Sequence, residues 1–532
     1  MYGVPPQSGA VSESTLSPED GAFPDAIRAR RWLAVALATT LVFRIWLSVV
    51  FPFTPDEAYF ALWGRYPDLG YHDHPPMVGW WLATTGALSE SVWALRVAAT
   101  FLPAACALLL RAAIRRWRPG EPALADWAAI CLLLLPSNVW NVLITTDTPL
   151  AFFTLLSILL LADSTQDARM LPRAAGALLA GVFLGLAFTS KYFAVLLGVA
   201  FLVWAGMGWR ERRWRTLALV IAGAVPFIAL NLYWNYQACW CNVMFNLFNR
   251  HEKAHWSVLT PGLYALTLAY LLGPLLYFAW RERSRMALRR GSSASAVVLA
   301  SWAIPLVLFG MLSLYVRIGL HWLFLFLPAV VLWLALEGGV IALVRSARIL
   351  AGLAVLHVVI AVSAAFLPLK YFSVRGLYPS LVFLTETRTL IETVRLDAPG
   401  YELASSAYAP AAVLGYHAGV NVPVFGMGSS HARQDDFSTD WRTYAGKNIV
   451  ILQRNDPSPD DYEPYFREVE MREISLGGVR FHEVLGREFN YERYRDAVLN
   501  QIRRRYYRIP GWLPVGQCIF CERYFPGGAC RE

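Results

Sequence analysis

Side chains that could exchange protons or bind charged groups lie in a few short segments between long apolar blocks. The first of these segments is Thr54-Pro55-Asp56-Glu57. A carboxylate in such a place can take a proton from a hydroxyl group as that group attacks an electrophile. The same residues also form the pattern of a helix start, in which Thr54 caps the helix and Glu57 completes a capping box. The sequence predicts a proton acceptor at Asp56 and leaves Glu57 open between a cap and a ligand-binding group.

The second segment places Asp73 and His74 next to each other before a pair of prolines. Asp and His side chains suit a divalent metal ion or a phosphate group, but they also cap helices. A later segment contains His255, which could complete a metal site with Asp73 and His74. The sequence therefore allows a site for Mg²⁺, Mn²⁺ or Zn²⁺, with helix capping as the alternative.

Three further groups stand at the ends of apolar blocks. Asp147 lies at a helix entrance, and a helix N-terminus is a ready site for an anion such as phosphate. Lys191 lies between two apolar blocks, where it could neutralise a phosphate or extend to the membrane surface. His321 stands at the start of another apolar block, where it could cap a helix, lie at the membrane interface or bind a ligand. Carboxylates and positive charge on one face suit the transfer of a group that leaves a phosphate behind.

The composition identifies the elements that must position these groups. Of the 532 residues, 56% are hydrophobic and 16% are charged, against about 25% charged in soluble proteins. A membrane-spanning helix needs about 20 apolar residues. This excludes an ordinary soluble enzyme and predicts a polytopic α-helical membrane protein. About eleven transmembrane helices are expected, near residues 32–51, 92–111, 124–142, 149–163, 174–190, 192–208, 216–233, 259–280, 294–316, 320–343 and 349–367.

Arginine-rich joints alternate with the joints that carry the acid–base groups. Positive residues concentrate on the cytoplasmic side of membrane proteins, so these joints predict a cytoplasmic N-terminus and an outer C-terminus. This orientation, and not binding to nucleic acid, explains the net charge of +9. Residues 1–27 are expected to form a disordered cytoplasmic head, and residues 76–88 an interfacial helix in the first outer loop. The candidate groups then all face the outer side.

Residues 368–532 differ from the apolar domain at 28–367. Their apolar runs are short and charges are frequent, which predicts a small α/β domain on the outer, periplasmic face. Outside the cytosol, Cys518 could pair with Cys521, and Cys239 with Cys241. The alternative is that these thiols, together with Cys530, stay unpaired. Strands are expected at 448–453 and 479–484, and helices at 385–396, 407–417 and 491–505.

Five short motifs occur in an order that resembles a known family. They are similar to the bacterial branch of the protein O-mannosyltransferase-like membrane glycosyltransferases. This branch is part of the C-type glycosyltransferase superfamily and includes the lipid A aminoarabinose transferases. The resemblance covers about residues 30–340. It rests on Pro55-Asp56-Glu57-Ala58-Tyr59, Gly70-Tyr71-His72-Asp73-His74-Pro75-Pro76, Thr146-Asp147-Thr148-Pro149-Leu150, Gly185-Leu186-Ala187-Phe188-Thr189-Ser190-Lys191-Tyr192 and Trp234-Asn235.

The resemblance implies a set of roles. The donor would be a sugar on a polyprenyl phosphate, transferred with inversion at the anomeric carbon. Asp56 corresponds to the acidic residue of the first outer loop, which is the expected base, Asp147 to a second acidic site, and Lys191 to the outer lysine. The aminoarabinose transferases have Glu-Lys-Pro-Pro where this chain has Asp73-His74-Pro75-Pro76, which predicts a different sugar. The expected substrate contacts are Glu57, Tyr59, His74, Lys191, Tyr192, His255 and His321.

The predicted function is transfer of a sugar from polyprenyl phosphate to an acceptor at the periplasmic face of the bacterial inner membrane. The acceptor would be lipid A or another glycolipid, a polysaccharide or a protein. The alternative is a transporter or flippase of lipid-linked sugars, which should place ionisable groups near the middle of its spans. Here Arg44 and Arg96 are the main charges inside spans, and the others gather on one face. The sequence therefore favours an enzyme.

Overall fold

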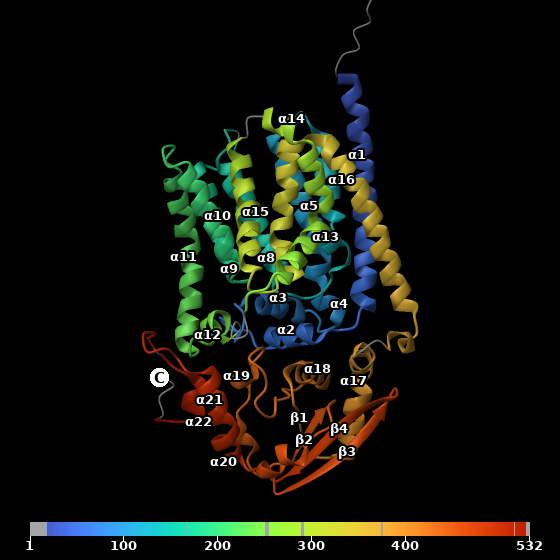
Figure 1. Cartoon of the computed structure of the whole chain (residues 1–532), viewed down its shortest axis with the longest axis vertical. Helices are drawn as coiled ribbons and strands as arrows, with labels where there is room; N and C mark the ends of the chain where they lie inside the picture. The colour runs from blue at the N-terminus through green and yellow to red at the C-terminus, as the bar shows by residue number, and fades with distance from the viewer. Residues whose placement is uncertain are drawn as a thin grey trace, which may run out of the picture.

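The computed structural model describes residues 19–167, 169–249, 255–288, 292–373, 376–514 and 516–527. A helical bundle forms one end of the molecule, and a smaller mixed domain forms the other (Figure 1). Residues 1–18 of the predicted head, and Cys530, lie outside the described residues. Helix α1 begins at Glu19. Helical structure therefore extends over residues 19–27 of the segment expected to be disordered, because an established helix adds flanking residues at little cost.

The predicted apolar blocks fall on helices of the bundle, and the last two, 320–343 and 349–367, both fall on the continuous segment from η2 to α16. The main helices are α1 (Glu19–Val50), α5 (Val97–Trp117), α6 (Pro122–Leu133), α8 (Asp147–Ser164), α9 (Arg173–Phe188), α10 (Ala194–Met207), α11 (Arg213–Gln237), α13 (Leu259–Arg281), α15 (Ser293–Leu312) and α16 (Leu327–Phe366). Short connecting segments are α4 (Val92–Leu95), α7 (Pro136–Trp140), α14 (Arg283–Leu288) and the 3₁₀ segment η2 (Leu320–Phe326).

Seven helical segments of the described chain are long and apolar enough to cross a membrane. Three shorter apolar helices, α6, α9 and α10, accompany them. The chain is therefore a polytopic helical membrane protein, while the number and direction of the crossings stay predictions. The seven long segments are Asp25–Val50, Val92–Trp117, Asp147–Ser164, Arg213–Gln237, Leu259–Arg281, Ser293–Leu312 and Leu320–Phe366.

Helix α16 departs from the predicted span boundaries. At Gly339 the backbone has φ 78° and ψ 177°, which is not helical, so the element consists of two helical segments. Glycine adopts such dihedrals without the steric cost that other residues meet. The break predicted at Arg345 to Arg348 was misplaced: it lies at Gly339, and both arginines belong to the second helical segment.

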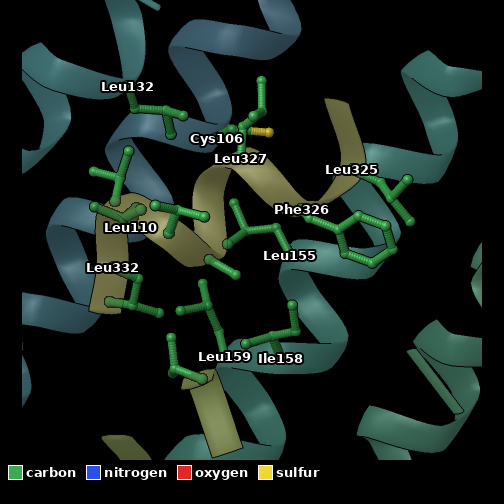
Figure 2. Close-up of a cluster of buried hydrophobic side chains, with 14 of the residues drawn as sticks. Cys106, Leu110, Leu132, Leu155, Ile158, Leu159, Leu325, Phe326, Leu327 and Leu332 are labelled. Carbon is green, nitrogen blue, oxygen red and sulfur yellow. The ribbon is translucent and has the colours of Figure 1, made fainter. Parts of the chain in front are cut away.

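The centre of the bundle is an apolar cluster from α5, α6, α8, η2 and α16 (Figure 2). Leu110, Leu155 and Phe326 of this cluster are completely buried. Since lipid is as apolar as leucine, such packing stabilises a membrane bundle mainly through close van der Waals contact. The cluster holds α8 in place, and the first residue of α8 is Asp147.

Two short helices lie across one end of the bundle, between it and the mixed domain (Figure 1). They are α2 (Pro55–Arg65) and α3 (Met77–Gly86), the latter at the predicted interfacial helix. The connecting loop is clamped between them, because Tyr71 stacks on Trp63 of α2 with ring centroids 4.2 Å apart. A Cβ atom at Gly79 of α3 would stand 2.2 Å from the Tyr71 Oη atom. Glycine at this position therefore lets the loop approach α3 closely.

The mixed domain is built on a four-stranded sheet of order β1-β2-β4-β3. The strands are β1 (Glu402–Ser405), β2 (Ile449–Gln453), β3 (Glu468–Leu476) and β4 (Val479–Arg487); β1 and β2 are parallel and the other pairs antiparallel. Side chains alternate across a strand, so Leu452 packs with the cluster of α17 and α18, and Ile451 with the opposite cluster. The helices are α17 (Leu377–Asp397), α18 (Tyr408–Ala418), α19 (Asp435–Ser438), α20 (Tyr491–Tyr494), α21 (Asn500–Tyr506) and α22 (Ile519–Tyr524). The expected strands at β2 and β4, and the expected helices at α17, α18 and α20 to α21, are present.

A disulfide bond joins the bundle to the mixed domain. It links Cys239, which follows α11, to Cys518, 279 residues later. The pairings considered from the sequence, Cys518 with Cys521 and Cys239 with Cys241, were therefore wrong, and Cys241 is a buried free thiol. Cys521 is also disulfide-bonded. The actual partners meet because α12 (Cys241–Leu247) packs against α21 of the mixed domain.

Candidate active site

Asp56 lies in the first turn of α2, which stands between the bundle and the mixed domain. The helix begins with the predicted capping box, in which Thr54 and Glu57 each accept from the other's backbone N–H. The Asp56 side chain reaches solvent, but the protein around it raises the pKa of its carboxyl through desolvation, and the charge of Glu57 raises it further. A hydrogen bond from Tyr408 of α18 opposes both effects. Asp56 is thus an accessible carboxylate with a strengthened affinity for a proton.

Glu57 occupies a different environment from its neighbour. It is completely buried, and its carboxylate accepts from Arg96 Nε at 2.8 Å and Arg96 Nη2 at 2.7 Å. The same carboxylate accepts from the backbone N–H of Thr54 at 3.0 Å and of Ile144 at 3.1 Å. These bonds join the start of α2 to α5 and to the segment before α8. They give Glu57 the capping role that the sequence left open.

Asp147 and Lys191 form a buried ion pair. The Lys191 Nζ atom lies 2.8 Å from each carboxylate oxygen of Asp147, and the two residues are 6% and 3% exposed. Asp147 begins α8, and Lys191 lies in the turn between α9 and α10. Lys191 also lies over the Phe193 ring, 5.0 Å from its centroid. A lysine held in this way is a fixed positive charge in a largely apolar surrounding.

Hydrogen bonds hold these three segments at the same end of the bundle. The bond from Ile144 to Glu57 places the entrance of α8 beside the start of α2. The Met77 N–H donates to the Thr189 carbonyl at 3.0 Å, which places α3 against the turn that carries Lys191. Asp56 and the Lys191–Asp147 pair therefore belong to one connected region at the end of the bundle that faces the mixed domain.

The loop between α2 and α3 contains Asp73, which accepts a hydrogen bond from Tyr59 of α2. The Tyr59 hydroxyl donates to Asp73 Oδ1 at 3.1 Å, and His74 Nε2 lies 3.8 Å from Asp73 Oδ2. Burial lowers the pKa of the neighbouring His72 to about 3, with help from the charge of Arg433, so its imidazole is neutral. Asp73 is nearly buried and His74 is half-buried.

No group of three or more His, Cys, Asp and Glu side chains is arranged to hold a metal ion in the described part of the chain. Asp73 and His74 lie together, but His255 does not complete a cluster with them there. His255 is exposed shortly before α13, and His321 is exposed at the start of η2. The metal set predicted from the sequence is therefore not assembled in the described residues.

Tyr192 follows Lys191 and faces the end of α11. Its hydroxyl donates to Asn231 Oδ1 at 3.1 Å, and Asn235 Nδ2 donates to the same oxygen at 3.2 Å. Asn235 is completely buried. The Tyr192–Asn231 bond thus joins the turn between α9 and α10 to α11, and Asn235 orients the Asn231 amide from within the same helix.

The mixed domain contributes residues that sequence reasoning missed. The Gln434 side chain accepts from the His72 N–H at 2.8 Å, and the Gln434 N–H donates to the Tyr59 hydroxyl at 3.2 Å. A cavity between α2 and α18 is lined by Tyr59, Tyr408 and Asp435 among others. Burial raises the pKa of Asp435 to about 7, with a further contribution from Asp436. Local sequence gives no sign of these contacts, since they join positions more than 350 residues apart.

The charges inside the predicted spans have structural partners. Arg96 pairs with Glu57 and also donates to carbonyls at the end of α1. Arg44 donates to four backbone carbonyls, including those of Thr100 and Asn141 at 2.8 Å each. Both side chains therefore satisfy backbone groups at helix ends, and neither is left as an unpaired charge in a transport path.

Comparison with known proteins gives one family match and one curated relative. Residues 73–234 match the family described as dolichyl-phosphate-mannose-protein mannosyltransferase. The chain is 30% identical over 290 residues to the lipid A galacturonosyltransferase RgtD of Rhizobium johnstonii. That match covers 51% of this chain and 58% of the relative, so the chain aligns with less than two thirds of it.

The fold is similar to that of ArnT from Cupriavidus metallidurans. Against its apo state the TM-score is 0.59 with 16% identity, over 86% of this chain and 98% of ArnT. Against ArnT bound to undecaprenyl phosphate the TM-score is 0.61 with 14% identity, over 85% and 98% of the two chains. The solved structures therefore show a fold like that of ArnT, and residues 73–234 match the mannosyltransferase family. Together with the similarity to RgtD, these findings confirm the predicted resemblance to membrane glycosyltransferases related to the enzymes that modify lipid A.

Proposed function

We propose that this protein transfers a sugar from a polyprenyl-phosphate donor to an acceptor at the periplasmic face of the inner membrane. The observation that carries the proposal is the accessible Asp56 carboxylate in the same connected region as the buried Lys191–Asp147 pair. The relatives support it, since RgtD is named for galacturonosyl transfer to lipid A and ArnT binds undecaprenyl phosphate. Lipid A or a related glycolipid is therefore the first acceptor to test, with polysaccharide and protein as the others.

The proposed reaction is a single displacement at the anomeric carbon. The acceptor hydroxyl oxygen forms a bond to that carbon while the bond from carbon to the phosphate oxygen breaks. The hydroxyl proton passes to Asp56, and polyprenyl phosphate leaves with the electron pair of the broken bond. Attack opposite the leaving group inverts the anomeric configuration. The raised pKa of Asp56 suits this role, because a general base works better as its pKa approaches the working pH.

Lys191 is the proposed partner of the departing phosphate. Its ammonium is held by Asp147, so it is in position before the substrate arrives. Fixed positive charge in a site of low polarity stabilises a developing phosphate anion more than the same charge in water. Asp147 orients the ammonium group of the lysine, and the N-terminus of α8 adds its own positive end. Tyr59, His74 and Tyr192 are proposed to line the bound sugar, while His255 and His321 remain candidates for the acceptor side.

Two observations support the proposed periplasmic location. Arginine-rich joints occupy the opposite end of the bundle from Asp56, which supports a cytoplasmic position for those joints. The disulfide between Cys239 and Cys518 lies at the Asp56 end, and disulfides persist in the periplasm and not in the cytosol. Polyprenyl-phosphate sugars are lipids, so they can reach a site at that face from within the membrane.

Purified protein in proteoliposomes separates this function from lipid-sugar transport. The donors are a panel of polyprenyl-phosphate sugars labelled in the sugar, and the acceptor is lipid A from a Gram-negative host. The proposal predicts label in the acceptor and one released polyprenyl phosphate for each sugar transferred. Movement of intact labelled donor across the bilayer, with no new glycosidic bond for any donor, would instead establish the transporter.

A further inference from the structure

A long groove runs between α1, α6 and the second segment of α16, away from the proposed catalytic region. Its volume is about 1050 Å³, at the upper end of the range of about 300–1,000 Å³ for small-molecule sites. The two helices that form its open side, α1 and α16, stand at the edge of the bundle (Figure 1). The proposed reaction makes no use of this groove.

The charged side chains of the lining lie at one end of the groove. Arg28 of α1 and Arg345 and Arg348 of α16 lie there, with Asp25 and Glu121. Arg345 is paired with Glu282 at 3.3 Å and Glu121 with Arg118 at 3.7 Å. The guanidinium groups of Arg28 and Arg348 are exposed and have no ion pair among the described residues. This end therefore presents two available positive charges against the single carboxylate of Asp25.

The rest of the groove is apolar apart from the hydroxyl groups of Thr39 and Thr40, which donate to backbone carbonyls of α1. Its walls include Val35, Val355 and Val359, which are 49%, 62% and 54% exposed. On α1 the lining extends from Arg28 to Phe43, which is about 22 Å of helix at 1.5 Å per residue. One leaflet contributes about 15 Å of hydrocarbon, which is half of the bilayer core. The groove is thus long enough for the acyl chains of a lipid whose head group lies at the arginines.

Trp32 lies one turn from Arg28 and is 50% exposed on the same wall. Tryptophan prefers the depth of lipid head groups. Basic pockets between membrane helices on the arginine-rich side recognise anionic lipid head groups. We infer that the groove is a binding site for one anionic phospholipid of the leaflet at the arginine-rich face, with its phosphate between Arg28 and Arg348.

Native mass spectrometry of the full-length protein tests this inference. The probes are phosphatidylglycerol and phosphatidylcholine with identical acyl chains. The wild type should bind one phosphatidylglycerol more tightly than phosphatidylcholine. The variant R28Q/R348Q should lose about 25-fold in phosphatidylglycerol affinity, at about fivefold for each arginine near the membrane surface. The matched control R30Q/R31Q removes the same charge from the same end of α1 outside the groove and should stay within about twofold of the wild type.

A second variant tests the apolar part without touching the arginines. Val355→Trp fills an exposed wall of the groove and should weaken phosphatidylglycerol binding, whereas Val195→Trp, at an exposed position of α10, should not. Equal affinity of the wild type for the two lipids would overturn the inference, as would equal losses in R28Q/R348Q and R30Q/R31Q. Either result would mean that the groove holds only exchangeable boundary lipid.

Discussion

Replacement of Arg96 by methionine should destabilise the protein far more than loss of a surface arginine. Arg96 and Glu57 are both completely buried and joined by two hydrogen bonds of 2.8 and 2.7 Å. Arg96→Met leaves the Glu57 carboxylate buried with no positive partner. Breaking a buried pair in this way costs about 3–5 kcal/mol. It also removes donors from the carbonyls of Ser48 and Phe51 at the end of α1.

The expected loss can be measured as a change in melting temperature. For proteins of 150–250 residues, 1 kcal/mol corresponds to about 2–4 °C, and the shift is smaller in larger chains. Because this chain is larger than 250 residues, about 2 °C for each kcal/mol is an upper bound, and a loss of 3–5 kcal/mol predicts a Tm lower than that of the wild type by at most about 6–10 °C. Thermal unfolding of the purified protein in detergent, followed by tryptophan fluorescence, gives this value.

Two variants make the test specific. Arg65→Met breaks the exposed pair between Arg65 and Glu90, and surface pairs contribute about 0–1 kcal/mol, so its Tm should fall by no more than about 2 °C. The double variant E57Q/R96M removes both buried charges and keeps a capping side chain, so it should be more stable than Arg96→Met alone. Equal effects of Arg96→Met and Arg65→Met would refute the assignment of Glu57 and Arg96 as a buried structural pair.

Three further perturbations follow from the geometry. Tyr408→Phe removes the hydrogen bond that lowers the pKa of Asp56, so the acidic limb of the pH–rate profile should move to higher pH; an unmoved limb would exclude Asp56 as the titrating base. Gly79→Ala should lower the free energy of unfolding by about 1–3 kcal/mol through overpacking, because the new Cβ would stand 2.2 Å from the Tyr71 oxygen. Gly86→Ala is the control, since a Cβ there has its nearest neighbour at 3.8 Å, and equal unfolding temperatures for the two variants would contradict this reasoning. Burial raises the pKa of Glu483 from 4.5 to about 7, so the wild type should lose stability as the pH rises from 4.5 to 7, and Glu483→Gln should be more stable than the wild type at pH 8 by up to about 3 kcal/mol. Chemical denaturation of both proteins at pH 5 and pH 8 measures the two free energies of unfolding, and a wild-type value that does not fall between these pH values would contradict the assignment.

Local patterns in the sequence predicted much of the architecture. The capping box at Thr54 and Glu57 depends on residues three positions apart, and the structure contains it. Apolar blocks of span length locate the helices of the bundle, because burial in lipid requires continuous apolar sequence. The strands β2 and β4 follow from short apolar runs in a charged tail. In each case the physical cause acts within one element.

Contacts between distant segments could not be predicted in this way. Sequence patterns assign Asp147 and Lys191 separate roles, and their pairing across 44 positions depends on how α8 meets the turn after α9. The disulfide partners of Cys239 were misjudged because nearby cysteines are favoured when only spacing is known. Tyr408 and Gln434 contact α2 and the loop after it through the docking of the mixed domain, which no local pattern encodes. The predicted break lay at Arg345 to Arg348, but the backbone breaks at Gly339. Charge marks a membrane boundary and does not identify the residue at which the helix is interrupted.

Sugar transfer by Asp56→Asn tests the central claim most directly. The change is nearly isosteric and removes the ability to accept a proton. Glu90→Gln is the matched control, since Glu90 is an exposed carboxylate of the same segment between α1 and α4. With the donor and acceptor that the wild type uses in proteoliposomes, Asp56→Asn should be slower by about 10²-fold or more, and Glu90→Gln should match the wild type. Transfer by Asp56→Asn at the wild-type rate would contradict the assignment of Asp56 as the base and leave it as a residue of the first turn of α2.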